Sequence, residues 1–185
     1  VIFNALHGQF GEDGYIQTIL DKFKIPYTHS GAIASSIAMD KEISKKLFIK
    51  NKIKTPKFFT YSYDITKSNL IEKINKYLRF PVVIKPLNEG SSVNVYITSI
   101  RTLDKILYKL KVYKKILIEE FIGGREIQVA IMGDKKLGAI ELKPKRKFYD
   151  YQAKYDTKSK TQHIIPVDLP KSKFNKVMDI AFKAH

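Results

Sequence analysis

The chain has 185 residues, of which 34 are Lys or Arg and 18 are Asp or Glu, so its formal net charge is +16. Hydrophobic residues make up 44% of the chain, enough at this length to bury a core, so intrinsic disorder is not expected. Cysteine is absent, which excludes disulfides, thiolate metal ligands and a cysteine nucleophile. No apolar run approaches the roughly 20 residues needed to cross a bilayer, so we expect a cytoplasmic protein without membrane contact.

The type of basic residue bears on nucleic-acid binding. Only four of the 34 basic residues are arginines, whereas base edges and phosphates are recognised best by arginine. A large excess of lysine is typical of a solvated surface. We therefore expect no nucleic-acid partner and keep a basic nucleic-acid-binding module as the less favoured alternative.

The first part of the chain, residues 1–38, has the pattern of a βαβ unit. Residues 1–6 form an apolar, strand-like run, and apolar residues recur at helical spacing after Gly14. Pro26 ends that helix. The segment 30–38 is rich in small residues and is expected to be flexible. We assign this part to the C-terminal end of an N-terminal α/β domain.

The second part, residues 39–114, has the short strands and helices of a small α+β domain. Asp40 is a good N-cap for its first helix. The elements expected after that helix are an extended run at 58–61, a helix over 68–78, strands at 81–85 and 93–97, and a helix over 101–111.

The third part, residues 115–185, contains more strands and a terminal helix, so the fold class of the chain is α/β and α+β. A polar stretch over about 143–163 has the length of a lid or binding loop. The terminal helix has no stop signal and residue 1 begins inside a strand, so the chain is expected to be an internal piece of a longer protein. The strands are expected at 116–119, 126–132 and 136–142, the last two joined by a turn at Gly133-Asp134.

Two lysines have positions that suit an anionic ligand. Lys85 ends an apolar strand and precedes a loop of Gly and hydroxyl residues, 89–93, whose N–H groups suit a polyphosphate. The spacing is neither that of a P-loop nor that of a dinucleotide-binding fold, and a surface lysine beside a hairpin explains it equally well. Lys41 lies in the first turn of a helix, where its charge opposes the helix dipole. With 30 lysines in the chain, chance also explains that position.

Three further features have a functional and a structural interpretation. Residues 117–126 place acids, an apolar pair and a Gly turn in an order that suits an adenine and a ribose, although a hairpin with charged ends fits as well. Residues 147–155 interleave aromatic and basic side chains, as in a lid over a charged ligand or a nucleic-acid stacking surface. His7 follows the first strand, where α/β sheets bind ligands, although a lone His is more often structural.

Taken together, these motifs resemble those of the D-alanine–D-alanine ligase family, whose members have the ATP-grasp fold. The resemblance runs in order through nearly the whole chain and is more specific than any single motif. It implies a partial ATP-grasp fold: the end of a Rossmann-like N-terminal domain, a complete central α+β domain, and the first part of the C-terminal ATP-grasp domain. The matching segments are 4–14 (NALHGQFGEDG), 26–31 (PYTHSG), 39–41 (MDK), 83–93 (VIKPLNEGSSV), 118–121 (IEEF), 148–155 (FYDYQAKY) and 183–185 (KAH).

The resemblance also implies roles for individual residues. His7 and Glu12 would lie on the side that receives the first D-alanine. The catalytic residues would be Ser91, in a loop over the terminal phosphate, with Lys154 and Tyr155 in the lid. The residues expected to bind ATP are Lys41 and Lys85 at the phosphates, Glu119, Glu120, Phe121 and Ile122 around the adenine, Glu126 at the ribose, and Tyr149 in the lid.

Two residues depart from the family pattern. Asn94 stands where the family usually has glycine, and Asn tolerates positive φ better than most residues. Gln9 stands where a basic residue is common in the family. The family's metal-binding acids and a catalytic arginine lie beyond residue 185, so Mg²⁺ or Mn²⁺ would be held outside this chain and no metal ligand is expected within it.

The implied function is that of an ADP-forming carbon–nitrogen ligase of peptidoglycan precursor synthesis. ATP would activate one D-alanine as an acyl phosphate, and a second D-alanine would attack it to give D-alanyl-D-alanine. A homodimer is expected. The isolated chain is expected to be inactive because it lacks the family's metal-binding acids and catalytic arginine. Another ATP-grasp carboxylate–amine ligase is the alternative.

Overall fold

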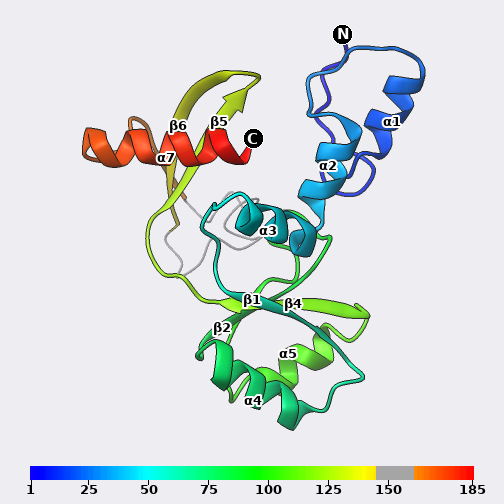
Figure 1. Cartoon of the computed structure of the whole chain (residues 1–185), viewed down its shortest axis with the longest axis vertical. Coiled ribbons are helices and arrows are strands. Elements are labelled where there is room, and N and C mark those ends of the chain that lie inside the picture. The colour runs from blue at the N-terminus through cyan, green and yellow to red at the C-terminus, as the bar shows by residue number, and fades with distance from the viewer. Residues whose placement is uncertain (145–160) are drawn as a thin grey trace. The chain divides into compact units, whose positions relative to one another are not determined.

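The computed structural model of the chain describes residues 1–144 and 161–185. The chain divides by its internal contacts into two compact units (Figure 1). The predicted division into three parts, with boundaries at residues 38 and 114, stays a prediction. The first unit comprises Val1–Leu47 and Thr55–Phe121, and the second comprises Phe48–Lys54 and Ile122–His185.

The first unit begins with two helices, α1 (Tyr15–Lys22) and α2 (Ala32–Met39), which pack against each other. Gly14 precedes α1 with φ +93°, and a Cβ at this position would lie 2.4 Å from the carbonyl oxygen of Ala32. A glycine is therefore required where the start of α1 meets α2.

Two expectations for this segment are wrong. In place of a strand over residues 1–6, the structure has a single parallel bridge between Ile2 and Tyr27. Residues 30–38, expected to be flexible, lie largely in α2. Several of their small residues are alanines, which have the highest helix propensity, so the composition that suggested flexibility favours a helix.

A four-stranded sheet and three helices follow, all in the first unit except for the last three residues of α3. The strands lie in the order β1-β4-β2-β3, and every pair is antiparallel. The strand that the sequence analysis placed at the start of the third part, β4, pairs with β1 on one side and with β2 on the other. It therefore belongs to the same sheet as the strands of the second part. The elements are α3 (Lys41–Lys50), β1 (Phe58–Ser62), α4 (Lys67–Tyr77), β2 (Val82–Pro86), β3 (Tyr96–Thr98), α5 (Leu103–Lys109) and β4 (Lys115–Glu120).

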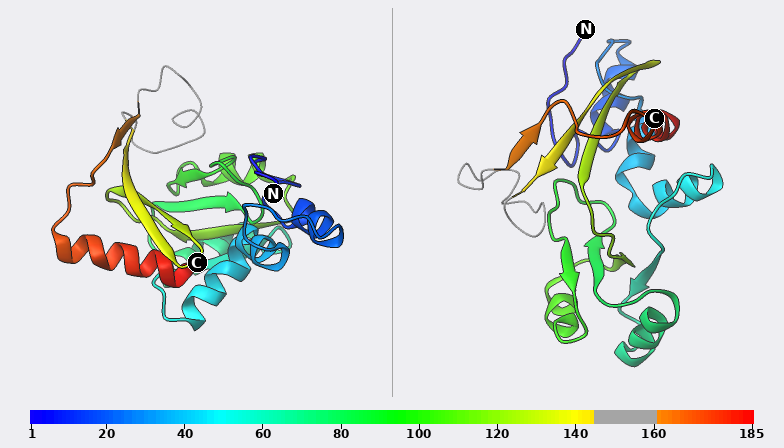
Figure 2. Two further views of the ribbon diagram at one scale, coloured as in Figure 1. Left: turned by 90° about the horizontal axis from the view of Figure 1, so that it is seen from above. Right: turned by 90° about the vertical axis from the view of Figure 1, so that its left-hand side faces the viewer.

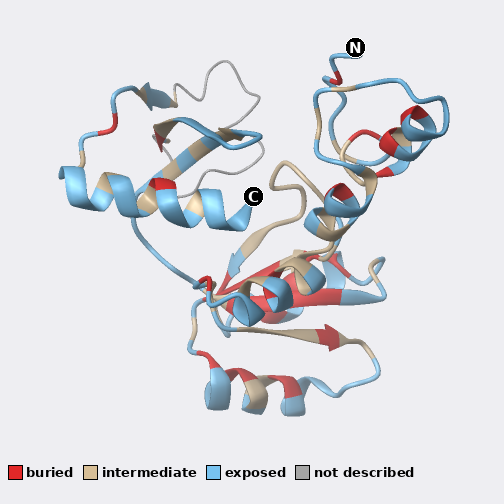
Figure 3. Cartoon of the chain, turned by 45° about the horizontal axis from the view of Figure 1, so that its top comes forward, coloured by how far each residue is buried: buried red, intermediate tan, exposed pale blue. Residues whose placement is uncertain are grey.

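The strand register gives this sheet two different faces. One face of β2 and β4 carries four fully buried aliphatic side chains, which form the core of the unit with α4 and α5. Figure 3 shows buried residues, in red, along the strands of this sheet. Because side chains alternate along a strand, Lys85 of β2 and Glu119 of β4 lie on the other face. The core residues of the first face are Val82, Ile84, Ile116 and Ile118.

The second unit contains a three-stranded antiparallel sheet, in the order β5-β6-β7, and one long helix. Gly133, with φ +57°, lies in the turn between β5 and β6, which confirms the predicted hairpin. Helix α7 packs against β5 and β6 (Figure 2). The short strand β7 was not predicted. The elements are β5 (Glu126–Met132), β6 (Lys135–Lys143), β7 (Gln162–Ile164) and α7 (Lys171–Ala184).

Arg125 connects three segments of the second unit. Its Nε and Nη2 donate to the two carboxylate oxygens of Glu141 on β6 at 2.7 and 2.5 Å, and its Nη1 donates to the carbonyl oxygen of Asp168 at 2.8 Å. A bidentate arginine–carboxylate pair is among the stronger polar contacts in proteins.

In the described parts of the chain, no helix is long and apolar enough to span a bilayer.

Candidate functional site

Two lysines share one buried carboxylate on the second face of the four-stranded sheet. Glu119 Oε2 accepts a hydrogen bond from Lys45 Nζ of α3 at 2.8 Å, and its Oε1 pairs with Lys85 Nζ of β2. The side chains of Lys45 and Glu119 are each 8% exposed, and that of Lys85 is 20% exposed. Lys45 Nζ also donates to Thr55 Oγ1 at 2.7 Å. One carboxylate against two ammonium groups leaves an excess of positive charge.

A third lysine, Lys41, adds to this positive charge. Its Nζ donates to the carbonyl oxygens of Leu87, at 3.0 Å, and of Glu89, both in the loop between β2 and β3. Burial, and then the nearby charge of Lys85, lower the pKa of Lys41 to about 8, against smaller opposing effects of the carboxylates of Glu89, Asp40 and Glu119. Burial also lowers the pKa of Lys45. Because an anion would relieve both desolvation and mutual repulsion, this cluster suits an anionic ligand.

The N-cap of α3 explains why a lysine occupies the first turn of that helix. Asp40 Oδ1 accepts hydrogen bonds from the backbone N–H groups of Glu42 and Ile43, each at 2.9 Å, which confirms the predicted cap. The cap fixes the start of α3 beside the β2–β3 loop, where Lys41 reaches the loop carbonyls. Lys41 therefore occupies a position where the helix dipole is unfavourable to its charge, because its ammonium group binds the carbonyl oxygens of the loop.

The β2–β3 loop has an unusual backbone conformation. Ser91, Ser92 and Asn94 have φ values of +49°, +61° and +55°, and the N–H of Val93 donates to the carbonyl oxygen of Gly90 at 2.9 Å. Residues other than glycine rarely adopt positive φ, and such conformations gather at functional sites. The φ of Asn94 explains how asparagine fits where the resemblance expects glycine.

The loop that carries His7 and Glu12 lies close to the β2–β3 loop. Glu12 Oε2 accepts from the N–H of Gly8 at 2.6 Å, and a Cβ built on Gly90 would lie 3.7 Å from the same oxygen. His7 is exposed. The two loops on which the sequence analysis placed substrate and phosphate binding are therefore neighbours within the first unit.

Buried amides support the His7–Glu12 loop from beneath. The carbonyl oxygen of Gly11 accepts from Asn4 Nδ2 at 3.0 Å and from Gln17 Nε2 at 2.9 Å. Asn4 Oδ1 in turn accepts from the N–H of Leu6 at 3.0 Å. Asn4 and Gln17 are buried, so these hydrogen bonds hold the loop on a fixed polar base.

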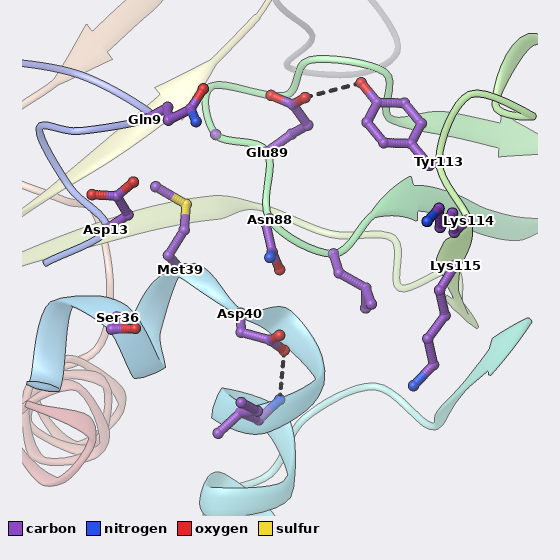
Figure 4. A pocket seen from close by; sticks show the side chains of 13 residues that line it. Gln9, Asp13, Ser36, Met39, Asp40, Asn88, Glu89, Tyr113, Lys114 and Lys115 are labelled. Carbon is purple, nitrogen blue, oxygen red and sulfur yellow. Dashed lines mark hydrogen bonds between the residues drawn. The ribbon is translucent and has the colours of Figure 1, made fainter. Parts of the chain in front are cut away.

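A cavity of about 550 Å³ opens beside these loops (Figure 4). Three carboxylates that line it have partners within the chain: Asp13 accepts from the N–H groups of Phe10 and Tyr15, Asp40 caps α3, and Glu89 accepts from the hydroxyl of Tyr113. These backbone bonds lower the pKa of Asp13. The wall of the cavity combines these polar groups with apolar residues such as Met39 and Ile43, and the three charges hold its elements in place. Its lining residues include Gln9, Asp13, Ser36, Asp40, Asn88, Glu89, Tyr113 and Lys115.

The structure brings part of the predicted site together. Lys41, Lys85 and Glu119 lie in one cluster, and Ser91 lies in the adjoining loop. Glu120 follows Glu119 on β4, so it lies on the opposite face of the sheet, and its N–H donates to the carbonyl oxygen of Lys57 at 2.9 Å.

The remaining predicted residues fall into two groups. Phe121 ends the first unit, whereas Ile122 and Glu126 belong to the second, Glu126 as the first residue of β5. The three predicted lid residues, Tyr149, Lys154 and Tyr155, lie outside the described residues.

Sequence reasoning missed Lys45, whose ammonium group is part of the cluster. Its spacing could have identified it, because Lys45 follows Lys41 by four residues and therefore lies on the same side of α3. Among the described residues, no three His, Cys, Asp or Glu side chains gather closely enough to hold a metal ion.

The comparisons with known proteins agree with these features. The fold is that of the ATP-grasp region in solved D-alanine–D-alanine ligases: the structure from Bacillus anthracis matches with a TM-score of 0.81 and 33% identity, over 98% of this chain and 59% of that chain. A second structure of the same Bacillus anthracis enzyme, complexed with ATP, matches with a TM-score of 0.76 and 29% identity, over 98% and 57%.

The chain belongs to the D-alanine–D-alanine ligase family. The family model described as "D-ala D-ala ligase C-terminus" matches residues 47–185. The D-alanine–D-alanine ligase of Pelagibacter ubique is 66% identical over the whole chain, and that of Wolbachia pipientis wMel is 41% identical over 99% of it. The chain spans 61% and 57% of the lengths of these two relatives.

Proposed function

We propose that the intact protein containing this chain ligates two D-alanines to D-alanyl-D-alanine with the conversion of ATP to ADP and phosphate, for the synthesis of peptidoglycan precursors. The observation that carries the proposal is the lysine cluster: Lys45 and Lys85 pair with one buried carboxylate, Glu119, and Lys41 lies near enough to respond to the charge of Lys85 while it binds the β2–β3 loop. Family membership, and relatives named for this activity, support the same reaction.

In this proposal the lysines hold the phosphates of ATP. Lys85 keeps its contact with Glu119, which fixes the position of its ammonium group at the end of β2. Lys41 exchanges the carbonyl oxygens of Leu87 and Glu89 for phosphate oxygens, because a charged acceptor forms a stronger hydrogen bond than a neutral one. The two cations thereby offset the charge that spreads over the phosphoryl oxygens during transfer.

The β2–β3 loop covers the terminal phosphate in the proposed reaction, and Ser91 donates to it. The carboxylate of the first D-alanine attacks the terminal phosphorus to form an acyl phosphate, with ADP as the leaving group. His7 and Glu12 lie on the side that receives this D-alanine; the proximity of Glu12 to Gly90 supports this placement. The amine of the second D-alanine then attacks the acyl carbon and phosphate leaves.

Several parts of the proposal rest on the resemblance alone. The adenine and ribose contacts of Glu119, Glu120, Phe121, Ile122 and Glu126 are among them. So is the lid with Tyr149, Lys154 and Tyr155, whose expected task is to exclude water from the acyl phosphate. The homodimer and the cytoplasmic location are proposed on the same basis. Mg²⁺ or Mn²⁺ finds no ligand set in the described residues.

The experiment measures phosphate release by the intact protein with ATP and D-alanine. We expect release to depend on D-alanine and to be absent with L-alanine. Lys85→Met keeps the apolar stem and removes the charge, so kcat/KM for ATP should fall at least about 100-fold, as for the loss of one preorganised donor to transition-state charge.

Lys67→Met is the matched control. Lys67 is also paired with a carboxylate, Asp104 at 2.9 Å, but this pair is exposed on α4 and α5. Its removal should leave kcat/KM unchanged within about twofold, because exposed pairs contribute little. Phosphate release by the wild-type protein that does not respond to D-alanine would contradict the proposed function.

A further inference from the structure

We propose that Asn94 and Tyr113 form a side-chain tether that positions Glu89 and holds the Ser91–Ser92 segment of the β2–β3 loop in its ligand-binding conformation. This inference rests on the proposed function, because it assigns the loop to the terminal phosphate of ATP. Asn94 and Tyr113 are positioning residues in it, since they act through the loop.

The tether consists of three consecutive hydrogen bonds. Tyr96 donates its hydroxyl to Asn94 Oδ1 at 3.1 Å, Asn94 Nδ2 donates to the Tyr113 hydroxyl at 2.8 Å, and that hydroxyl donates to Glu89 Oε1 at 3.0 Å. Figure 4 shows the last of these contacts at the edge of the cavity. The chain of bonds joins the end of the loop to its beginning through Tyr113, which lies between α5 and β4.

The direction of each bond makes asparagine specific at position 94. The amide donates on one side and accepts on the other, so both of its ends are used. Aspartate has the same shape but no donor for Tyr113, and its charge would lie near Glu89. Glycine adopts positive φ readily but has no side chain. Asn94 therefore supplies both the φ of +55° and the tether.

Tyr113 is a donor to Glu89 over a wide range of pH. Burial of the ring is the main cause that raises the pKa of Tyr113; the hydrogen bond from Asn94 lowers it in part, and the hydrogen bond to Glu89 raises it again. The hydroxyl therefore keeps its proton well above neutral pH. A phenol that stays neutral can accept from Asn94 and donate to Glu89 at once, which connects the two residues without a charge of its own.

The loop is thereby held at both ends. Lys41 Nζ holds the carbonyl oxygens of Leu87 and Glu89 at its start, and the tether holds Asn94 at its end. Between them lie Ser91 and Ser92, both at positive φ. In the proposed reaction Lys41 leaves the carbonyls for phosphate, and the tether then keeps the loop ordered. A loop ordered in advance loses less conformational entropy when the ligand binds.

The test compares four variants of the intact protein in steady-state kinetics and in amide hydrogen exchange without nucleotide. Asn94→Gly and Tyr113→Phe should each lower kcat/KM for ATP about three- to tenfold, mainly through KM, which is the effect of one net hydrogen bond. The double variant should have about the same kcat/KM as the more impaired of the two single variants, because both changes break the same tether. Asn94→Asp should be at least as impaired as Asn94→Gly.

Hydrogen exchange gives a readout that does not depend on turnover. The amides of Val93 and Val95, which donate to Gly90 and Ser92 within the loop, should exchange faster in Asn94→Gly and Tyr113→Phe. Tyr63→Phe is the matched control, because Tyr63 also donates its hydroxyl within the first unit, to the carbonyl oxygen of Leu107 at 3.0 Å. It should change neither KM nor the exchange of the loop.

Three outcomes would overturn the tether. These are single-variant effects that multiply in the double variant, loop exchange equal to that of the wild type, and an equal KM shift in Tyr63→Phe. A wild-type protein that shows no D-alanine-dependent turnover contradicts the proposed function instead, and the hydrogen exchange of the loop still decides whether the tether exists.

Discussion

The two faces of the four-stranded sheet differ in composition although they belong to the same strands. On one face of β2 and β4, four aliphatic side chains are fully buried against α4 and α5. On the other, Lys85 and Glu119 meet Lys45 from α3. Because neighbouring residues of a strand point to opposite faces, Ile118 belongs to the core and Glu119 to the charged cluster.

The comparison separates what makes the fold stable from what makes the site. Apolar burial on the first face stabilises the fold in proportion to the area removed from water, whichever apolar side chains are in contact. On the second face, the desolvation of three ammonium groups and a carboxylate is unfavourable unless each is paired. Substitutions in the core should therefore be tolerated when they keep apolar area buried, whereas the loss of any one member of the charged cluster should leave another buried charge unpaired.

The largest expected effect comes from the shared carboxylate. Glu119→Gln leaves Lys45 buried without a counter-charge, so the free energy of unfolding should fall by about 3–5 kcal/mol, measured by urea denaturation. The double variant Glu119→Leu with Lys45→Met should recover most of that loss, because no unpaired buried charge remains. The control Asp104→Asn removes an exposed partner and should change stability by less than about 1 kcal/mol. A Glu119→Gln variant as stable as this control would contradict the interpretation.

A neighbouring pair on β4 compares the two faces directly. Ile118 and Leu117 are both fully buried, but Leu117 pairs with Lys85 and lies on the charged face. Ile118→Ala and Leu117→Ala should each reduce the free energy of unfolding by about 2–5 kcal/mol, as other large-to-small changes in cores do.

The two variants should differ in ligand binding. We expect Leu117→Ala to raise KM for ATP, because Lys85 loses its packed neighbour, and Ile118→Ala to leave KM near the wild-type value below its unfolding temperature. Equal KM values in the two variants would show that the faces are not functionally distinct. Val112→Ala, at a position that is 80% exposed, controls for the loss of methyl groups without a cavity.

Several strand positions and the cap of α3 were predicted from the sequence. Local patterns set them, so β5 was predicted with its observed bounds and Asp40 was predicted as a cap, whereas the strand expected at 93–97 is observed as β3 at Tyr96–Thr98. The placement of β4 between β1 and β2 was not predicted, because pairing across dozens of residues leaves no local signal. The three-residue strand β7 is too short to have a pattern of its own.

The site was predicted to the extent that its members stand in ordered motifs. Lys41, Lys85 and Glu119 do so, and the structure gathers them. Lys45 does not: its spacing of four residues from Lys41 places it on the same side of α3, but its partner Glu119 is 74 residues away, so the pairing leaves no local signal. The side-chain contacts of Asn94 also leave no signal in the sequence, although asparagine is a residue type that tolerates the positive φ observed there.

The smallest expected effect concerns the proton on Lys41. Its pKa is lowered to about 8 in the chain without ligand, first by burial and then by Lys85. An incoming polyphosphate favours the charged ammonium and raises this pKa, so ATP binding should take up protons. At pH 8, where Lys41 is half protonated, uptake should approach about half a proton per ATP.

The same shift sets the pH dependence of affinity. Below about pH 7 Lys41 is charged before and after binding, so its protonation does not change the affinity for ATP with pH. As pH rises through 8, binding must first protonate Lys41, and the contribution of this group to affinity should fall up to about tenfold per pH unit, until the pKa of the complex is reached. Titration calorimetry of the intact protein at pH 8, in two buffers with different ionisation enthalpies, measures the uptake. Lys41→Arg should abolish it, because arginine stays protonated, whereas uptake that persists in Lys41→Arg would assign the proton to another group.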